Sequence, residues 1–219
     1  GLKSNLRQRF RYRQFSRIID RYLREIVDNL GDLEKYKSKP PVISCGEYPE
    51  LNFPPYIILT SDSLRDSFKP LSEWLTKKGL KAGIYSVDSI LTSTEINSVK
   101  EINDDAGIIR SFLRQAYLHG AGWLLIGGNE DVIPVRYGTC ENNDTSVSER
   151  PPADLYYSDF DGNWNIDGDE LYGEPVDDSL DYYPELFTGR IPCSNPKQIT
   201  NWIEKIMSYS KNPGKKITI

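Results

Sequence analysis

Oxygen-bearing side chains crowd the stretch between Asp159 and Glu170, where the sequence has its clearest capacity for chemistry. Six of them fall at positions one, three, five, seven, nine and twelve of a twelve-residue window: Asp159, Asp161, Asn163, Asn165, Asp167 and Glu170. Calcium takes about six to eight oxygen ligands, and alternate residues of a tight loop can turn their oxygens toward one ion. The spacing therefore predicts a calcium-binding loop.

Trp164 marks the departure of this window from the calcium loop of helix–loop–helix proteins. Such loops carry glycine at the sixth position for a sharp turn, and no helix clearly precedes the window. An EF-hand is therefore not expected. The alternative interpretation is an acidic, solvated turn punctuated by Asn and Gly. Three nearby acids extend the negative patch and could share an ion: Asp177, Asp178 and Asp181.

A cysteine–histidine catalytic pair has little support in the sequence. The only histidine, His119, is followed by Gly120 near the end of a predicted helix, a position typical of a side chain that contacts the helix C-terminus. A catalytic thiolate needs an activating base beside it. Cys45 lies in a predicted linker, Cys140 in a polar loop and Cys193 at a strand end. Three widely spaced cysteines form neither a metal quartet nor an obvious disulfide framework.

Four segments, at 56–60, 81–87, 123–126 and 185–192, predict strands. They alternate with apolar faces of helical period over 64–75, 108–117 and 199–206, where Asp104 or Asp105 can cap the second helix and Pro70 should kink or restart the first. Alternating strands and helices are typical of a parallel sheet. The expected fold class is therefore α/β: three layers, with a mainly parallel, doubly wound sheet that carries helices on both faces and is preceded by an N-terminal helix.

The third strand is the one around which the domain is expected to form. Its run Trp123–Ile126 is apolar without alternation, as in a strand covered on both faces, and Gly127 and Gly128 then allow a sharp turn. Asn129, Glu130 and Asp131 follow at the carboxyl end of the strand, the edge at which ligand crevices form in open α/β sheets.

The chain is predicted to comprise a basic amphipathic helix (1–31), a Pro-rich linker (32–55), an α/β domain (56–215) and the start of a further strand (216–219). Residues 1–40 hold eleven Lys and Arg against five Asp and Glu, whereas the remainder holds 16 against 27. An acidic main domain would repel phosphate, so nucleic acid is not an expected partner. No apolar run reaches the roughly 18 residues of a membrane span.

Several motifs in order resemble one family. They are the strand Tyr56–Thr60, the helix end Trp74–Gly79, Leu124–Gly127 with Val132–Pro134, Ala153–Tyr157, Leu186–Pro192 and the helix end Lys205–Tyr209. In this order they resemble the amino-terminal, non-catalytic subdomain of the gingipain-type cysteine peptidase domain. The resemblance covers about residues 56–212, and each motif is only moderately specific alone.

This resemblance implies a caspase-like fold and a Cys–His dyad in a second subdomain, so no catalytic residue is assigned to this chain. His119 precedes the Leu124–Gly127 strand and does not match the family's histidine. The family's calcium ligands shortly before the Gly-Arg strand correspond to Asp181 and Glu185, whereas an aspartate that follows the earlier strand corresponds to Gly128. The resemblance also implies a secreted or cell-surface enzyme, a catalytic subdomain as partner, and a protein or peptide substrate.

Three functions remain in view. The leading hypothesis is a calcium-stabilised supporting subdomain of a gingipain-like cysteine endopeptidase, inactive alone. The second is a catalytically inactive, calcium-dependent binding module. The third is a nucleotide- or phosphate-binding doubly wound domain that would use Asp62, Asp104 or Asp105 with the Gly127–Gly128 turn. No P-loop lysine follows this turn, which ranks the third hypothesis lowest.

Overall fold

The computed structural model describes residues 53–93, 104–139, 150–174, 177–180 and 182–211. All of them belong to one compact unit, Cys45–Ile219. The predictions for the N-terminal helix, for most of the linker and for residues 216–219 lie outside the described residues. Cys45, Cys140 and Asp181 also lie outside them.

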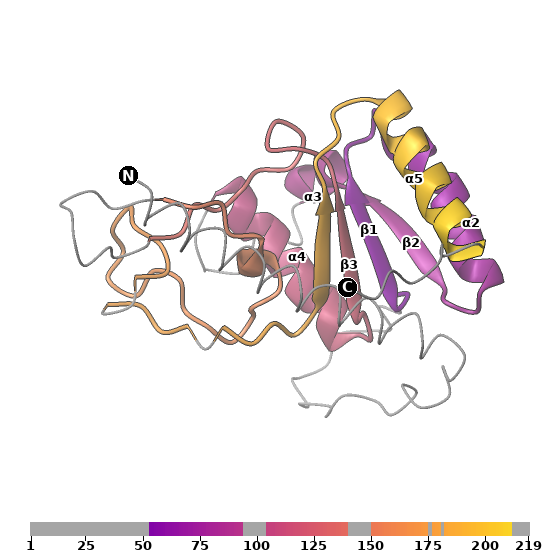
Figure 1. The fold of residues 1–219 in the computed structure, drawn as a ribbon. Helices are drawn as coiled ribbons and strands as arrows, with labels where there is room; N and C mark the ends of the chain where they lie inside the picture. The colour runs from indigo at the N-terminus through magenta and orange to yellow at the C-terminus, as the bar shows by residue number, and fades with distance from the viewer. Residues whose placement is uncertain (1–52, 94–103, 140–149, 175–176, 181, 212–219) are drawn as a thin grey trace, which may run out of the picture. The chain divides into compact units, whose positions relative to one another are not determined.

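A four-stranded parallel sheet forms the centre of the unit (Figure 1). Its strands are β1 (Tyr56–Thr60), β2 (Ala82–Ser86), β3 (Trp123–Gly127) and β4 (Phe187–Ile191), in the order β2-β1-β3-β4. Every pairing is parallel. The sheet confirms the predicted fold class. The two central strands, β1 and β3, are buried almost throughout, as strands covered on both faces of a parallel sheet are.

Helices cover both faces of this sheet (Figure 1). α2 (Lys69–Lys77) and α5 (Pro196–Lys211) lie on one face, and α3 (Val87–Thr92) and α4 (Asp105–Leu118) lie on the other. Alternate strand residues enter two separate cores. Ile58 and Leu125 pack with Ile199 of α5, whereas Ile57 and Leu124 pack with Ile109 of α4.

Local sequence signals explain where these helices begin. The Asp104 side chain accepts a hydrogen bond from the Gly107 amide at 2.8 Å and caps α4, as one of the two predicted alternatives required. Pro70 restarts its helix: a 3-10 turn, η2 (Arg65–Phe68), leads directly into α2. A proline is tolerated in the first turn of a helix, where no amide partner is lost.

The segment between β3 and β4 has little regular structure. It contains the 3-10 turn η4 (Asp154–Tyr157) and two isolated bridges, Tyr137↔Pro152 and Asn163↔Ser179. Its aromatic side chains nevertheless enter the α4-side core, where Tyr156 is fully buried and Trp164 is 3% exposed. This burial accounts for tryptophan at the position where a calcium loop of the helix–loop–helix type has glycine.

None of the helices in the described ranges combines the length and apolarity needed to cross a bilayer.

Candidate functional site

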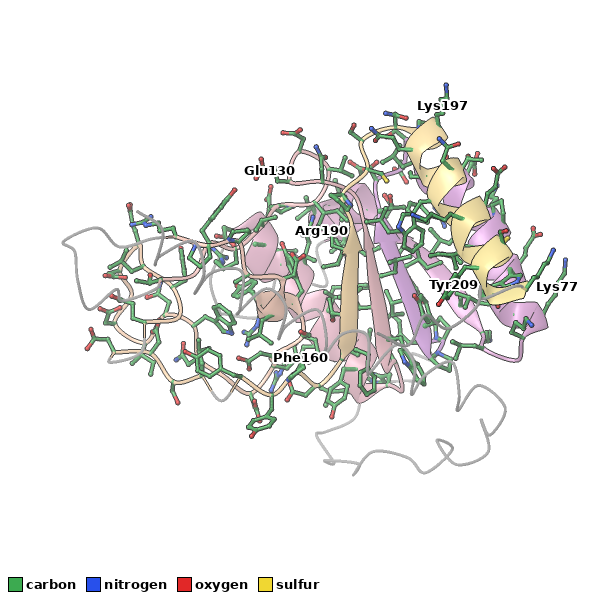
Figure 2. All side chains as sticks on the ribbon, viewed as in Figure 1. Lys77, Glu130, Phe160, Arg190, Lys197 and Tyr209 are labelled. Carbon is green, nitrogen blue, oxygen red and sulfur yellow. The ribbon has the colours of Figure 1, made fainter. Side chains whose placement is uncertain are left out.

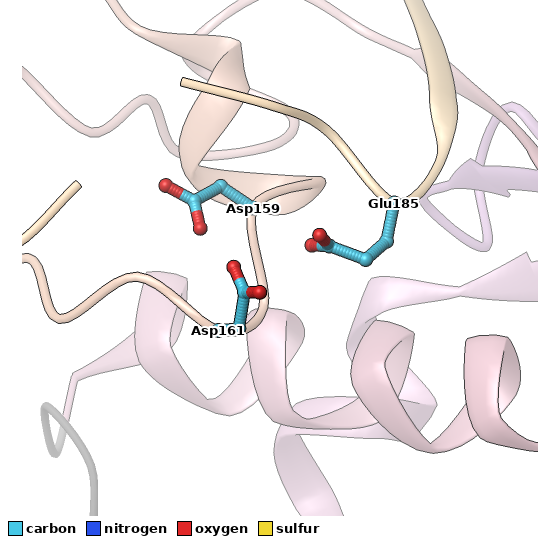
Figure 3. A group of neighbouring side chains, drawn as sticks. All are labelled: Asp159, Asp161 and Glu185. Atoms are coloured by element: carbon cyan, nitrogen blue, oxygen red, sulfur yellow. The ribbon is translucent and has the colours of Figure 1, made fainter. Parts of the chain in front are cut away.

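Three carboxylates from two parts of the chain converge beside α4 (Figure 3). One ligand oxygen from each of Asp159, Asp161 and Glu185 lies within 4.8 Å of the others. Asp159 is buried, Glu185 is partly buried and Asp161 is exposed. These residues are called the carboxylate centre below. The centre unites two residues of the predicted window with a third that lies just before β4.

Asp159 is held rigidly at the inner side of the centre. Its carboxylate accepts hydrogen bonds from the Gly162 amide at 2.8 Å and from Nε1 of Trp164 at 3.1 Å. Its main-chain oxygen accepts bonds from Nε of Arg110 at 3.0 Å and from Nη2 at 2.6 Å. A Cβ atom at Gly162 would lie 2.6 Å from either carboxylate oxygen, so this turn requires glycine. The direction of the Asp159 carboxylate is therefore set by the surrounding fold.

Glu185 is attached to the same turn at two points. Its main-chain amide donates to Ser158 O at 2.7 Å, and its carboxylate accepts from the Phe160 amide. Burial raises the pKa of Glu185, and the negative charges of Asp161 and Asp159 raise it further, although the Phe160 hydrogen bond opposes them. The centre thus gathers hard oxygen donors at a cost in electrostatic repulsion, which a bound cation would relieve.

A second acidic group lies farther along the segment. Oxygens of Asp167, Asp169 and Glu174 also lie within 4.8 Å of one another, with both aspartates exposed. Burial and the charges of Asp169, Asp177 and other neighbouring acids raise the pKa of Glu174. Asp169 and Glu174 were absent from the predicted ligands. Asp169 stands between the ninth and twelfth positions of the calcium-loop spacing, and Glu174 lies four residues beyond the window.

Three further predicted ligands in the described part of the chain have other surroundings. The side-chain oxygen of Asn163 accepts from the Asn165 amide at 3.1 Å, and that of Asn165 accepts from the Gly168 amide at 2.8 Å, so both build turns. Glu170 is exposed and belongs to neither group. Asp178, named as a residue that could share an ion, accepts bonds from the amides of Ile166, Gly173 and Glu174. The twelve-residue window therefore folds as two separate acidic groups.

His119 and Cys193 lie at opposite ends of the strands of the sheet. His119 ends α4 on the side where β3 begins; its Nδ1 lies 2.7 Å from Gln115 O and its ring packs near Phe53. Cys193 follows the carboxyl end of β4 and is 7% exposed in the α5-side core. The two ends of a five-residue strand are about 13–17 Å apart, since each residue of a strand advances by about 3.3 Å. Burial also raises the pKa of the Cys193 thiol, which disfavours the nucleophilic thiolate.

The groups of the phosphate-binding hypothesis have structural partners. Asp104 caps α4 and forms a 2.7 Å ion pair with Arg136. Gly127 faces the ring of Phe68, so closely that a Cβ atom there would lie 2.7 Å from its Cε2. These structural contacts account for the presence of Asp104 and Gly127, and no bound phosphate is needed to explain either residue.

A parallel sheet with helices on both faces defines the class of this chain as a three-layer α/β domain. The profile of peptidase family C25 matches residues 50–218, and the chain therefore belongs to this family of cysteine peptidases.

The chain is also similar to several known proteins. Lys-gingipain of Porphyromonas gingivalis is 24% identical over 161 residues, as is Lys-gingipain 381 of the same species. Each alignment covers 71% of this chain and only 7% of the relative. A solved structure described as that of a protease has 23% identity and a TM-score of 0.46. The match covers 70% of this chain and 27% of the protease chain. Gingipain R, an arginine-specific cysteine proteinase, has 16% identity and a TM-score of 0.44, with 78% and 30% covered.

Proposed function

We propose that this chain is the amino-terminal, supporting subdomain of a gingipain-like cysteine endopeptidase that acts outside the cytoplasm on proteins or peptides. Its partner is the catalytic subdomain of the same protein, which supplies the cysteine and the histidine. The observation that carries the proposal is the family match over residues 50–218, combined with the separation of His119 from Cys193 by the length of a strand.

The test of this role is peptide hydrolysis. The 219-residue chain is expected to hydrolyse no peptide with lysine or arginine before the scissile bond, whereas the same chain extended through the rest of the encoded protein is expected to hydrolyse it. Activity of the 219-residue chain that disappears in the Cys193→Ala variant would contradict the proposal. An inactive extended protein would instead favour the binding-module alternative.

We further propose that the carboxylate centre binds calcium. Asp159, Asp161 and Glu185 would hold the ion, with the exposed Asp161 nearest to solvent. Calcium accepts carboxylate oxygens in flexible geometry, and water or main-chain oxygens can complete its coordination. The bound ion would join the turn at 159–161 to the entrance of β4, so its chemistry is structural and it takes no part in peptide hydrolysis.

Calorimetric titration of calcium tests this centre directly. Glu185→Gln is expected to weaken binding by at least about tenfold, because one charged ligand is lost, and each factor of ten corresponds to about 1.4 kcal/mol. Glu170→Gln is the matched control, since it removes an exposed acid of the same segment that belongs to neither acidic group. Equal weakening by the two substitutions would place the ion elsewhere or indicate only diffuse attraction.

A further inference from the structure

Arg190 of β4 reaches across the carboxyl edge of the sheet to the loop that follows β3, which is called the edge loop below (Gly128–Pro134). Its Nη1 donates to Gly128 O at 2.9 Å and to Ile133 O at 3.0 Å, so that one guanidinium group grips both ends of this loop. Longer contacts run from Nη1 to Asn129 O at 3.4 Å and from Nη2 to Pro134 O at 3.5 Å.

Asp154 fixes the guanidinium group from the other side. Nε and Nη2 of Arg190 donate to its two carboxylate oxygens, each at 2.8 Å, in the paired geometry that only arginine provides. The Arg190 side chain is 12% exposed. Because its position is set by Asp154, the guanidinium group acts as a fixed anchor for the carbonyl groups of the edge loop.

The edge loop is folded tightly and still presents charge to solvent. Its main chain is bonded to the segment that follows β4, because the Asn129 amide donates to Cys193 O at 3.1 Å. Gly128 approaches Val132 so closely that a Cβ atom would lie 2.6 Å from its side chain. Glu130 and Asp131 are exposed, and the Glu130 carboxylate accepts from the Tyr137 hydroxyl at 2.6 Å. Figure 2 shows Glu130 above Arg190, at the same end of the sheet.

Irregular backbone at the carboxyl edge of a parallel sheet is where α/β folds bind ligands. Without Arg190, the edge loop would lose the donor shared by its two ends. We propose that Arg190 is a positioning residue of the peptidase: it fixes the edge loop as a wall of the substrate cleft. This inference rests on the proposed function, because the cleft is completed only by the catalytic subdomain.

Hydrogen exchange of the 219-residue chain tests the first half of the inference. Arg190→Gln is expected to raise amide exchange in residues 128–134 by at least about tenfold, since the loop would open more often. Arg190→Lys keeps the charge beside Asp154 but loses the planar fork, and an intermediate rise is expected. Arg65→Gln, an exposed arginine of η2, is the control and should leave the loop unchanged. Unchanged exchange in Arg190→Gln would overturn the proposal.

Steady-state kinetics of the extended protein test the second half. Arg190→Gln is expected to raise KM on the order of tenfold with kcat within about twofold, and Arg190→Lys to recover part of the loss. Damage to the fold alone would lower the active fraction and hence the apparent kcat, but not raise KM. Should Arg190→Gln fail to fold, the lysine variant carries both measurements. A looser loop with unchanged KM would show that the loop does not meet substrate and would overturn the inference. A wild-type extended protein without activity would refute the proposed function itself, whereas the exchange result would still stand.

Discussion

Glu185 links the charge of a single residue to the stability of the fold. Its pKa is raised above the ordinary value of 4.5 by burial and then by Asp161 and Asp159. The metal-free folded state therefore binds a proton more readily than the unfolded state does. The stability that this group contributes is fully present below pH 4.5 and is lost as the pH rises through its raised pKa.

From this sign, Glu185→Gln is expected to stabilise the metal-free chain at neutral pH. The glutamine keeps an oxygen for the Phe160 amide and removes the repulsion, so a rise in Tm of about 2 °C is expected in the presence of a chelator. Thermal melts at pH 4 and pH 7 provide the check, with the gain confined to the higher pH. A lower Tm of the variant at both pH 4 and pH 7 would mean that the surroundings stabilise the Glu185 side chain more than they repel its charge.

Glycine is needed at position 127 because a larger side chain would not fit there. Its φ is not positive, so the backbone conformation itself does not require glycine. An added Cβ would lie 2.7 Å from Cε2 of Phe68 and 3.2 Å from Leu59 O. Overpacking of this kind costs about 1–3 kcal/mol, so Gly127→Ala should lower the free energy of unfolding by that amount in urea titrations. Gly122→Ala is the control, since nothing lies within 4 Å of its added Cβ. A neutral Gly127→Ala would mean that the Phe68 ring of η2 can move away from β3 at no cost.

Among the elements, α4 depends on one acidic residue with two tasks. Asp104 caps the helix through the Gly107 amide and also pairs with Arg136, which is 6% exposed and lies 4.1 Å from the ring centroid of Tyr172. Asp104→Ala is expected to cost about 2–3 kcal/mol, because a cap is worth about 1 kcal/mol and a buried arginine would lose its partner.

The adjacent residue offers a matched comparison for this prediction. Asp105 is exposed in the first turn of α4, where it contributes only a favourable charge near the helix N-terminus. Asp105→Ala should therefore cost less than about 1 kcal/mol in the same denaturation assay. If the two substitutions cost the same, the ion pair with Arg136 adds nothing to stability.

Strands and long helices were predictable because their signals are local. Trp123–Ile126 is apolar throughout, and Leu64, Phe68 and Leu71 repeat at helical spacing; all three of these side chains are buried. The short helix α3 was not expected, because six residues are too few for a periodic pattern. The 3-10 turn η4 was missed for the same reason.

The candidate site was less predictable, because it is assembled over long sequence separations. Spacing within 159–170 suggested a single loop of ligands. In the structure, Trp164 is buried in the middle of that window, and Asp159 and Asp161 meet Glu185 instead of Asp167. Glu185 had been proposed from the family resemblance and not from spacing. No local pattern indicates that residue 185 meets residue 159, since their contact depends on the closure of β3 against β4.

For the molecule as a whole, calcium should act as a folding ligand. An ion bound only to the folded state adds about 2.7 kcal/mol when free calcium is one hundred times its Kd. Chelation is therefore expected to lower the Tm of the wild-type chain by about 5–10 °C. Glu185→Gln should respond about half as strongly as the wild type or less, because a site weakened tenfold adds only about 1.4 kcal/mol at the same calcium concentration. Glu170→Gln should respond like the wild type. A wild-type melt indifferent to chelation would count against the calcium centre.

The bridge between Asn163 and Ser179 has a consequence for how this protein can diverge. Two main-chain bonds, of 2.8 Å and 3.1 Å, bring the ends of a long detour of the chain together. The exposed residues 167–170 beyond this junction can lengthen, shorten or change composition while Asp159, Asp161 and Glu185 stay in register. Related proteins are therefore expected to tolerate insertions and deletions between residues 167 and 170 far better than single changes at the junction itself.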